Sequence, residues 1–178
     1  IGIGGIGMSA IAMGLLKKGY SVSGSDLLKN NEMNNLKKSG ALIFESQIKQ
    51  NIKFLELKFN NKLINYVVSS AIKPENEELS YCLKNNLPIK HRSDILTMLM
   101  QSYTSFGVAG SHGKTSTSTF LSTLLELCTH NSSSITGGII PIYDSNAHVE
   151  NTKYLVAEID ESDGTISKYK SDIGIINN

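Results

Sequence analysis

The sequence predicts an α/β fold with parallel sheets, divided into two consecutive units. Short apolar runs alternate with segments of helical period along the chain. A glycine-rich loop at residues 2–7 stands between an apolar run and a helical segment, and a second one at residues 110–115 stands in the same context. An order of strand, glycine loop and helix is typical of nucleotide-binding units.

Composition restricts the class of partner. The chain has 178 residues and a formal net charge of +1, with both signs interspersed, so it offers no basic field for nucleic acid. No apolar run reaches the roughly 20 residues that span a bilayer, and no leader peptide is visible. We therefore expect a cytoplasmic protein with neither a nucleic-acid nor a membrane partner. Cys82 and Cys128 lack disulfide or zinc spacing and are predicted to be reduced core thiols.

The first unit opens on G-x-G-x-x-G, formed by Gly2, Gly4 and Gly7 after a short strand at residues 1–3. A helix ending at Gly19 follows, then a strand at residues 20–23. Asp26 comes about twenty residues after the loop, the spacing at which a carboxylate accepts a hydrogen bond from a ribose hydroxyl in a Rossmann-like unit. A solvated turn residue that caps a helix is the alternative interpretation of Asp26.

The remainder of the first unit continues the alternation. A strand at residues 63–68 ends in Ser69 and Ser70, whose hydroxyls would contact a phosphate or sugar, or else cap the strand end. The other elements expected here are a helix around Leu36, a strand at 41–44, a helix at 74–86 with Pro74 in its first turn, an edge strand at 87–90 and a helix at 93–100. The lysine- and asparagine-rich stretches at 29–35 and 58–62 are expected to be exposed to solvent. The domains are predicted to be residues 1–102 and 103–178.

The second unit carries a short nucleoside-triphosphate loop after a strand at 106–109. Backbone N–H groups of such a loop curl around phosphate oxygens, Lys114 would reach the β- and γ-phosphates, and the Thr115 hydroxyl would bind Mg²⁺. Position 108 is Val where the full signature has glycine, so a chance glycine-rich turn is the alternative. The following helix is expected to face a sheet with Phe120, Leu121, Leu124, Leu125 and Cys128.

An acidic strand end completes the second unit. A buried strand at 154–157 delivers four carboxylates, and side chains two apart on a strand share one face. We expect Glu158 and Asp160 to approach a cation over the Lys114 loop, with Glu158 the stronger candidate for magnesium and a solvated acidic turn the alternative. Around this strand we expect a flexible connection at 132–134, a strand at 135–140 broken by Gly137 and Gly138, a polar loop at 141–152 and a last strand at 173–176.

Five motifs in this order, at residues 2–9, 22–26, 67–72, 110–115 and 157–163, together resemble the Mur ligases over essentially the whole chain. The resemblance implies that the first loop binds the diphosphate of a UDP-sugar and not NAD. By the same matching, Thr115 and Glu158 are the magnesium ligands and Lys114 is catalytic. The UDP-sugar residues implied are Gly4, Gly5, Ile6, Gly7, Met8, Ser9, Asp26, Ser69, Ser70 and Asn146, and the ATP residues are Gly110, Ser111, His112, Gly113, Lys114, Thr115 and Ser116.

The implied activity is ATP-dependent amide-bond formation between UDP-N-acetylmuramate and L-alanine through an acyl phosphate, in peptidoglycan precursor synthesis. The family continues beyond Asn178, and both ends of this sequence read as interrupted strands, so we expect a fragment that is inactive without the C-terminal part. Two alternatives stay open. One is the recycling ligase that joins a ready-made peptide to the same UDP-sugar, and the other is an NAD-binding oxidoreductase or sensor with a degenerate nucleotide loop.

Overall fold

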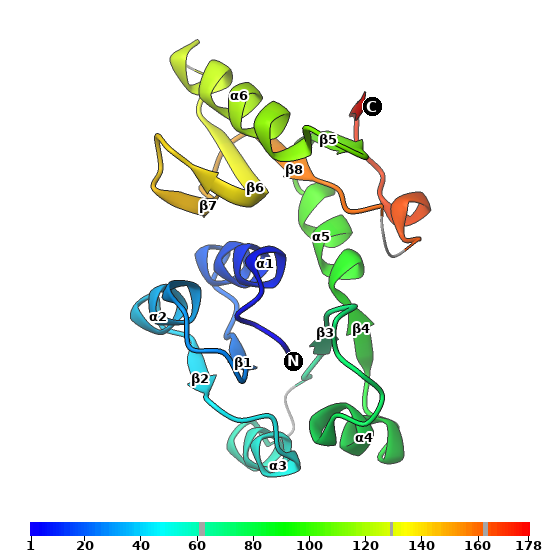
Figure 1. Cartoon of the computed structure of the whole chain (residues 1–178). Coiled ribbons are helices and arrows are strands. Elements are labelled where there is room, and N and C mark those ends of the chain that lie inside the picture. Colours follow the sequence, from blue (N-terminus) through cyan, green and yellow to red (C-terminus); the bar gives the residue numbers. More distant parts are fainter. Residues whose placement is uncertain (61–62, 129, 162–163) are drawn as a thin grey trace.

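The computed structural model describes residues 1–60, 63–128, 130–161 and 164–178. Within these ranges the strands form a pair of β1 (Ser23–Ser25) with β2 (Leu42–Phe44), a pair of β3 (Tyr66–Val68) with β4 (Ile89–His91), and a five-stranded sheet (Figure 1). Every pairing is parallel except one in the large sheet. The predicted α/β fold with parallel sheets is confirmed.

The first three residues connect the two small pairs into one layer. The backbone nitrogen of Ile1 donates to the Val67 carbonyl at 2.7 Å, and the N–H groups of Gly2 and Ile3 donate to the Ser25 carbonyl at 2.9 and 3.0 Å. The layer therefore runs β2, β1, residues 1–3, β3, β4, and the chain starts between β1 and β3 (Figure 1). In sequence order this is 3-2-1-4-5, the order of a Rossmann-like sheet.

Five helices accompany this layer. Figure 1 shows α1 between the lower and the upper part of the molecule, and α5 running from β4 up to β5. The helices are α1 (Ile6–Lys17), α2 (Asn31–Lys38), α3 (Lys49–Lys58), α4 (Glu77–Lys84) and α5 (Arg92–Met100).

The large sheet forms the upper part, in the order β7-β6-β8-β5-β9. β5 pairs with β8 on one side and β9 on the other, so the end of β5 lies beside the ends of both neighbours. The elements are β5 (Thr104–Gly110), α6 (Lys114–Leu127), β6 (Ser132–Ile140), β7 (Ser145–His148), β8 (Tyr154–Glu158), a 3-10 turn (Ile166–Lys168) and β9 (Ile173–Asn177).

One apolar core is shared by the upper and lower parts. Ile11 of α1 and Leu96 and Leu99 of α5 are buried in the same cluster as Ile135 of β6 and Leu155 of β8. Burial of apolar side chains contributes about 1.5–3 kcal/mol for each large one. The two glycine loops are thus held in one packed body, while the proposed boundary between residues 102 and 103 stays a prediction.

The predicted connection at residues 132–134 is wrong, because these serines begin β6. They are fully buried, and the hydroxyls of Ser133 and Ser134 have partners there: Ser134 donates to Ser122 at 2.8 Å, and Ser133 lies 2.9 Å from the Thr152 hydroxyl. β6 itself continues to Ile140, but its pairing with β7 is irregular between Ile135 and Ile140, where the break at Gly137 and Gly138 was expected. β7 stands inside the expected loop at 141–152.

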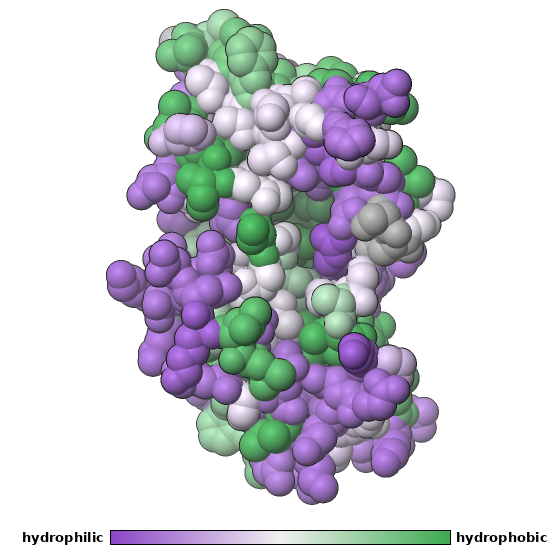
Figure 2. Space-filling view, in the orientation of Figure 1, coloured by the Kyte–Doolittle hydropathy of each residue, from purple (hydrophilic) through white to green (hydrophobic). Residues whose placement is uncertain are grey.

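The face of α6 predicted to meet the sheet is only partly right. Phe120 is 70% exposed and Leu124 and Cys128 are exposed, whereas Leu121 and Leu125 are half-buried and the fully buried residues of the helix are Ser118 and Ser122. Hydrophobic residues accordingly appear at the α6 end of the surface in Figure 2, above a lower half that is largely hydrophilic.

Smaller expectations also change. The residues at 1–3 do not form a regular strand, β1 starts at Ser23, Pro74 precedes α4 instead of lying in it, and α3 was not foreseen.

Cys82 is buried as expected, and burial raises its pKa to about 11, whereas Cys128 is exposed. Part of the stretch expected to be solvated, residues 61–62, lies outside the described ranges.

Glu78 of α4 provides a test of how the lower layer is held. Its carboxylate is 1% exposed and accepts hydrogen bonds from Ser25 at the end of β1 and from Asn51 of α3, the latter at 2.7 Å. We expect Glu78→Ala to lower the free energy of unfolding by about 2–3 kcal/mol, because two buried donors lose their acceptor. Urea titration of both forms measures the difference.

Burial raises the pKa of Glu78 above its ordinary value of 4.5. The folded state therefore holds this proton more tightly than the unfolded state, and the contribution of Glu78 to stability falls as pH rises from about 4.5 through the folded-state pKa. Glu78→Gln keeps an acceptor oxygen and cannot ionise, so its stability should decline less than that of the wild type over this window. Parallel decline in both proteins would contradict the assignment.

Candidate functional site

The second glycine loop is shaped by its neighbour β9. Gly110 has φ +131°, and a Cβ on it would lie 2.0 Å from the Asn177 carbonyl oxygen, so no other residue fits there without displacing β9. Gly113, at φ +75°, precedes the first turn of α6, and no side chain caps this helix end. The loop thus directs unpaired N–H groups and the positive end of the helix to one point, as an anion site requires.

Lys114 closes over this loop. Its Nζ donates to the Gly110 carbonyl at 2.6 Å and to Glu161 Oε1 at 2.9 Å, and the hydrogen bond from Lys114 is the main reason that the pKa of Glu161 is lowered. An ammonium group held across the loop by flanking oxygens is in place to meet a phosphate, which would compete with Glu161 for it. The outer loop residues Ser111, His112, Gly113 and Ser116 are exposed.

Thr115 and Glu158 lie in contact, as the acidic strand end predicted. The Thr115 hydroxyl is 3.0 and 3.2 Å from the two carboxylate oxygens, and the Gly137 N–H holds Oε2 at 2.8 Å. A Cβ on Gly137 would lie 2.7 Å from Glu158 Oε1, so the glycine leaves the room that this carboxylate occupies. A Cβ on Gly138 would likewise lie 2.7 Å from Thr115 Cγ2, so both glycines of β6 leave room for the Thr115–Glu158 contact.

The oxygens at this position fit magnesium. A hydroxyl and a carboxylate are hard ligands, and Glu161 Oε2 nearby is buried without a hydrogen-bond partner. Over residues 1–60, 63–128, 130–161 and 164–178, no three histidine, cysteine or acidic side chains gather as a metal cage. Two protein oxygens would leave the other positions to phosphate and water, which is how proteins usually hold this ion.

Asp160 does not join Glu158, contrary to the prediction. β8 ends at Glu158, so the alternation of side chains does not continue to Asp160, whose carboxylate pairs with Arg92 of α5. Asp163, also expected at this strand end, lies outside the described residues.

The first glycine loop is ordered by side chains on both sides of it. Gly4 donates its N–H to Asp26 Oδ2 at 2.8 Å, and Asn30 Nδ2 donates to the Gly4 carbonyl at 2.7 Å. Asp26 therefore shapes the loop directly, a role that its spacing did not indicate. The first N–H groups of α1, from Ile6 and Gly7 onward, have no acceptor within the helix, and Gly5 supplies no side-chain cap.

Asn146 of the upper sheet reaches this loop. Its Nδ2 donates to the Ile6 carbonyl at 2.8 Å and to the Ser9 hydroxyl at 3.0 Å. Ser9 and Met8 are buried, while Gly5 and Ile6 are exposed at the start of the helix. The structure thus brings Asn146 to the residues that the resemblance groups with it, although they are about 140 positions apart.

Ser69 and Ser70 lie where β3 ends, close to the same loop. A Cβ on Gly2 would be 3.1 Å from the Ser69 hydroxyl, and the Ser70 hydroxyl lies 3.0 Å from His91 Nε2. His91 and Arg92 were not assigned from the sequence. Their position directly after β4, the strand beside β3, was the available indication, because ends of parallel strands meet at one edge.

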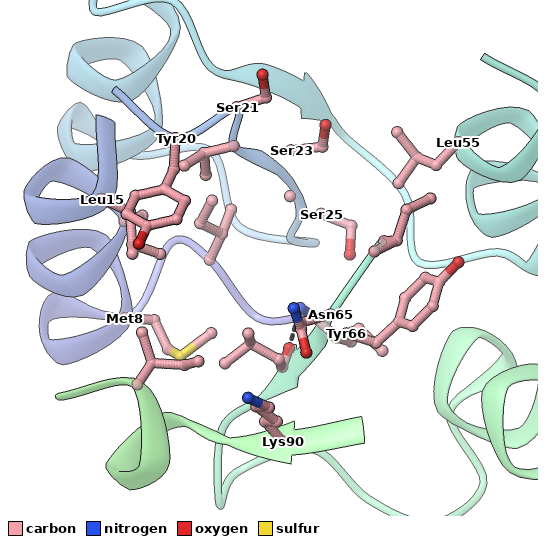
Figure 3. Close-up of a pocket in the computed structure, with 18 of the residues that line it drawn as sticks. Met8, Leu15, Tyr20, Ser21, Ser23, Ser25, Leu55, Asn65, Tyr66 and Lys90 are labelled. Atoms are coloured by element: carbon pink, nitrogen blue, oxygen red, sulfur yellow. Dashed lines mark hydrogen bonds between the residues drawn. The ribbon is translucent and has the colours of Figure 1, made fainter. Parts of the chain in front are cut away.

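One interior cavity lies beside the first unit's strands. It measures about 410 Å³ and opens between β1 and β3, lined mainly by apolar side chains such as Leu15 and Leu55 (Figure 3). Of the predicted site residues only Met8 borders it. Neither residues 4–7 nor residues 110–116 line this cavity. Among the described residues, no helix has the length and apolarity to cross a membrane.

Comparison with known proteins gives consistent matches. Residues 1–104 match the model of the Mur ligase family, catalytic domain. The UDP-N-acetylmuramate--L-alanine ligase of Prochlorococcus marinus subsp. pastoris is 76% identical over the whole chain, and that of P. marinus strain SARG is 51% identical. The chain spans 38% of the length of each of these relatives.

Solved structures agree in fold. The UDP-N-acetylmuramate-alanine ligase of Thermotoga maritima matches with a TM-score of 0.86 and 27% identity, covering 99% of this chain and 40% of that one. The UDP-N-acetylmuramate:L-alanyl-gamma-D-glutamyl-meso-diaminopimelate ligase of Neisseria meningitides matches with a TM-score of 0.81 and 25% identity, covering 91% and 52%. With a family model that covers more than half of its residues, this chain belongs to the Mur ligase family.

Proposed function

We propose that this chain forms the UDP-sugar site and the first part of the ATP site of a UDP-N-acetylmuramate:L-alanine ligase. The observation that carries the proposal is the Thr115–Glu158 contact beside Lys114, at the mouth of a glycine loop packed in one body with a second glycine loop. A triphosphate and a diphosphate each find an uncapped helix N-terminus. The identity of 76% to an alanine ligase supports this substrate pair.

In the proposed reaction the lactyl carboxylate of the sugar attacks the γ-phosphorus of ATP, and ADP leaves. The amine of L-alanine then attacks the carbonyl carbon of the acyl phosphate and releases phosphate. Lys114 stabilises the negative charge on the transferring phosphoryl group, and Mg²⁺, when held by Thr115 and Glu158, adds charge neutralisation there. Because the substrate carboxylate is itself the nucleophile, the chain needs no nucleophilic side chain.

The first loop is proposed to hold the diphosphate on the N–H groups that start α1. Asp26 keeps the loop in shape through Gly4, and Ser69 and Ser70 lie at the neighbouring strand end where uridine would bind. Asn146 of β7 donates to the Ile6 carbonyl, so it lies on the side of the loop that faces the five-stranded sheet. We propose that it contacts the sugar there. The cytoplasmic location expected from the sequence stays part of this proposal.

The two alternatives are weaker. The fold alone is shared with a peptide-adding ligase at a TM-score of 0.81, but the identity to it is 25%. Giving the complete enzyme either L-alanine or a tripeptide separates these activities. An NAD-dependent enzyme is disfavoured by the family match over residues 1–104, which include the first glycine loop.

The first test concerns the ligand of the first loop. Calorimetric titration of the chain should show tighter binding of UDP-N-acetylmuramate than of NAD⁺. Gly4→Val should abolish this binding, because a Cβ at position 4 would lie 2.9 Å from Asp26 Oδ2 and displace the carboxylate that orders the loop. Gly174→Val is the matched control, because Gly174 lies on β9 outside the first loop and a Cβ there would meet only Ser171 Oγ, at 3.9 Å. Preference for NAD⁺ would sink the proposal.

A second test concerns the ATP site. Lys114→Gln should weaken ATP binding about tenfold or more, since a hydrogen bond to a charged group contributes about 1.5–3 kcal/mol. Glu158→Gln should weaken binding of ATP with Mg²⁺ but change binding of ATP with EDTA little. Lys37→Gln, on the exposed surface of α2, is expected to bind like the wild type. Equal loss of both forms of ATP in Glu158→Gln would speak against a role with the metal.

A third test concerns the activity of these 178 residues. Because the relatives are much longer, we expect no alanine-dependent phosphate release from this chain in the presence of ATP, Mg²⁺ and UDP-N-acetylmuramate. Turnover by the chain would show that the remaining part of the relatives is dispensable.

A further inference from the structure

Arg92 lies where the two proposed sites approach each other. It is the first residue of α5, directly after β4, and its Nη2 pairs with Asp160, two residues beyond Glu158. The side chains are 17% and 36% exposed, so the pair is partly shielded from water but remains accessible. The ion pair therefore links α5 of the first unit to the acidic residues that follow β8 in the five-stranded sheet.

The guanidinium also reaches the first glycine loop. A Cβ placed on Gly7 would lie 3.1 Å from Arg92 Nη1, so this nitrogen stands against the loop backbone at the start of α1. The fork of Arg92 thus has one terminal nitrogen on Asp160 and the other beside the N–H groups proposed to receive the diphosphate. A guanidinium offers five donors in a planar fork and binds phosphate oxygens in pairs.

We propose that Arg92 binds the diphosphate of the UDP-sugar, and that Asp160 holds the guanidinium in place until the substrate arrives. The inference rests on the proposed function and adds to it a binding residue outside the glycine loop. A diphosphate carries more negative charge than one carboxylate and accepts bidentate hydrogen bonds, so it competes for the guanidinium. Asp160 is then an internal competitor of the substrate.

This role predicts opposite effects for the two partners of one ion pair. If Arg92 binds phosphate, removing it weakens UDP binding, whereas neutralising Asp160 removes a competing anion and strengthens it. If the pair is only a strut between the two parts of the molecule, losing either partner acts in the same direction. A second ion pair, between Lys168 and Asp94 at 2.9 Å, also joins α5 to the upper part and provides a control, because it involves neither Arg92 nor Asp160.

The experiment is calorimetric titration of the chain with UDP and with uridine, without ATP or Mg²⁺. Arg92→Gln should weaken UDP binding about tenfold or more. It should leave uridine binding unchanged, because uridine carries no phosphate. Asp160→Asn should strengthen UDP binding, and Lys168→Gln should bind like the wild type. Circular dichroism spectra and melting temperatures show that each variant is folded.

Three results would overturn the inference. UDP binding by Arg92→Gln equal to wild type excludes contact with the diphosphate, while weakening by both Arg92→Gln and Asp160→Asn identifies a strut. In both cases wild-type binding of UDP leaves the proposed function standing. Failure of the wild-type chain to bind UDP would overturn the proposed function together with this inference.

Discussion

The burial of helix α1 on two sides is the constraint on which the arrangement of the sites depends. Ile11 belongs to a core that also contains Leu99 of α5 and Ile135 of β6, so the helix packs against elements of both parts of the molecule. Because the first glycine loop is the start of this helix, its position relative to the five-stranded sheet is fixed by apolar packing. The hydrogen bonds from Asn146 to Ile6 and Ser9 then align the loop with β7.

The direction of the strands explains the second site. β5 lies between β8 and β9, and all three run parallel, so their carboxyl ends meet at one edge of the sheet. Lys114 and Thr115 follow β5, while Glu158 ends β8. Because β5 and β8 are parallel neighbours, their ends bring these residues close together. Asn177, on β9, closes the other side of the loop against Gly110.

Short sequence motifs predicted those features of the structure that depend on neighbouring residues and on strand direction. The fold class, both glycine loops and the contact of Glu158 with Thr115 follow from short motifs and from strand direction. The sequence did not reveal that Asp160 pairs with Arg92, because that pairing joins residues 68 positions apart in the chain. It placed the buried face of α6 only in part, since Leu121 and Leu125 are half-buried but the fully buried positions are hydrogen-bonded serines, which apolar periodicity does not mark.

The buried serines of α6 have a consequence for how the proposed ATP site tolerates substitution. Ser118 and Ser122 are small, and Ser122 meets Ser134 of β6 at 2.8 Å, which sets the helix close to the strands. Lys114 and Thr115 belong to the first turn of that helix. The distance between the Thr115 hydroxyl and the Glu158 carboxylate therefore depends on how closely α6 packs on the strands. A bulkier side chain at either serine would push α6 away from the strands. It would thereby change the distance between Thr115 and Glu158, although neither serine belongs to the proposed phosphate-binding residues.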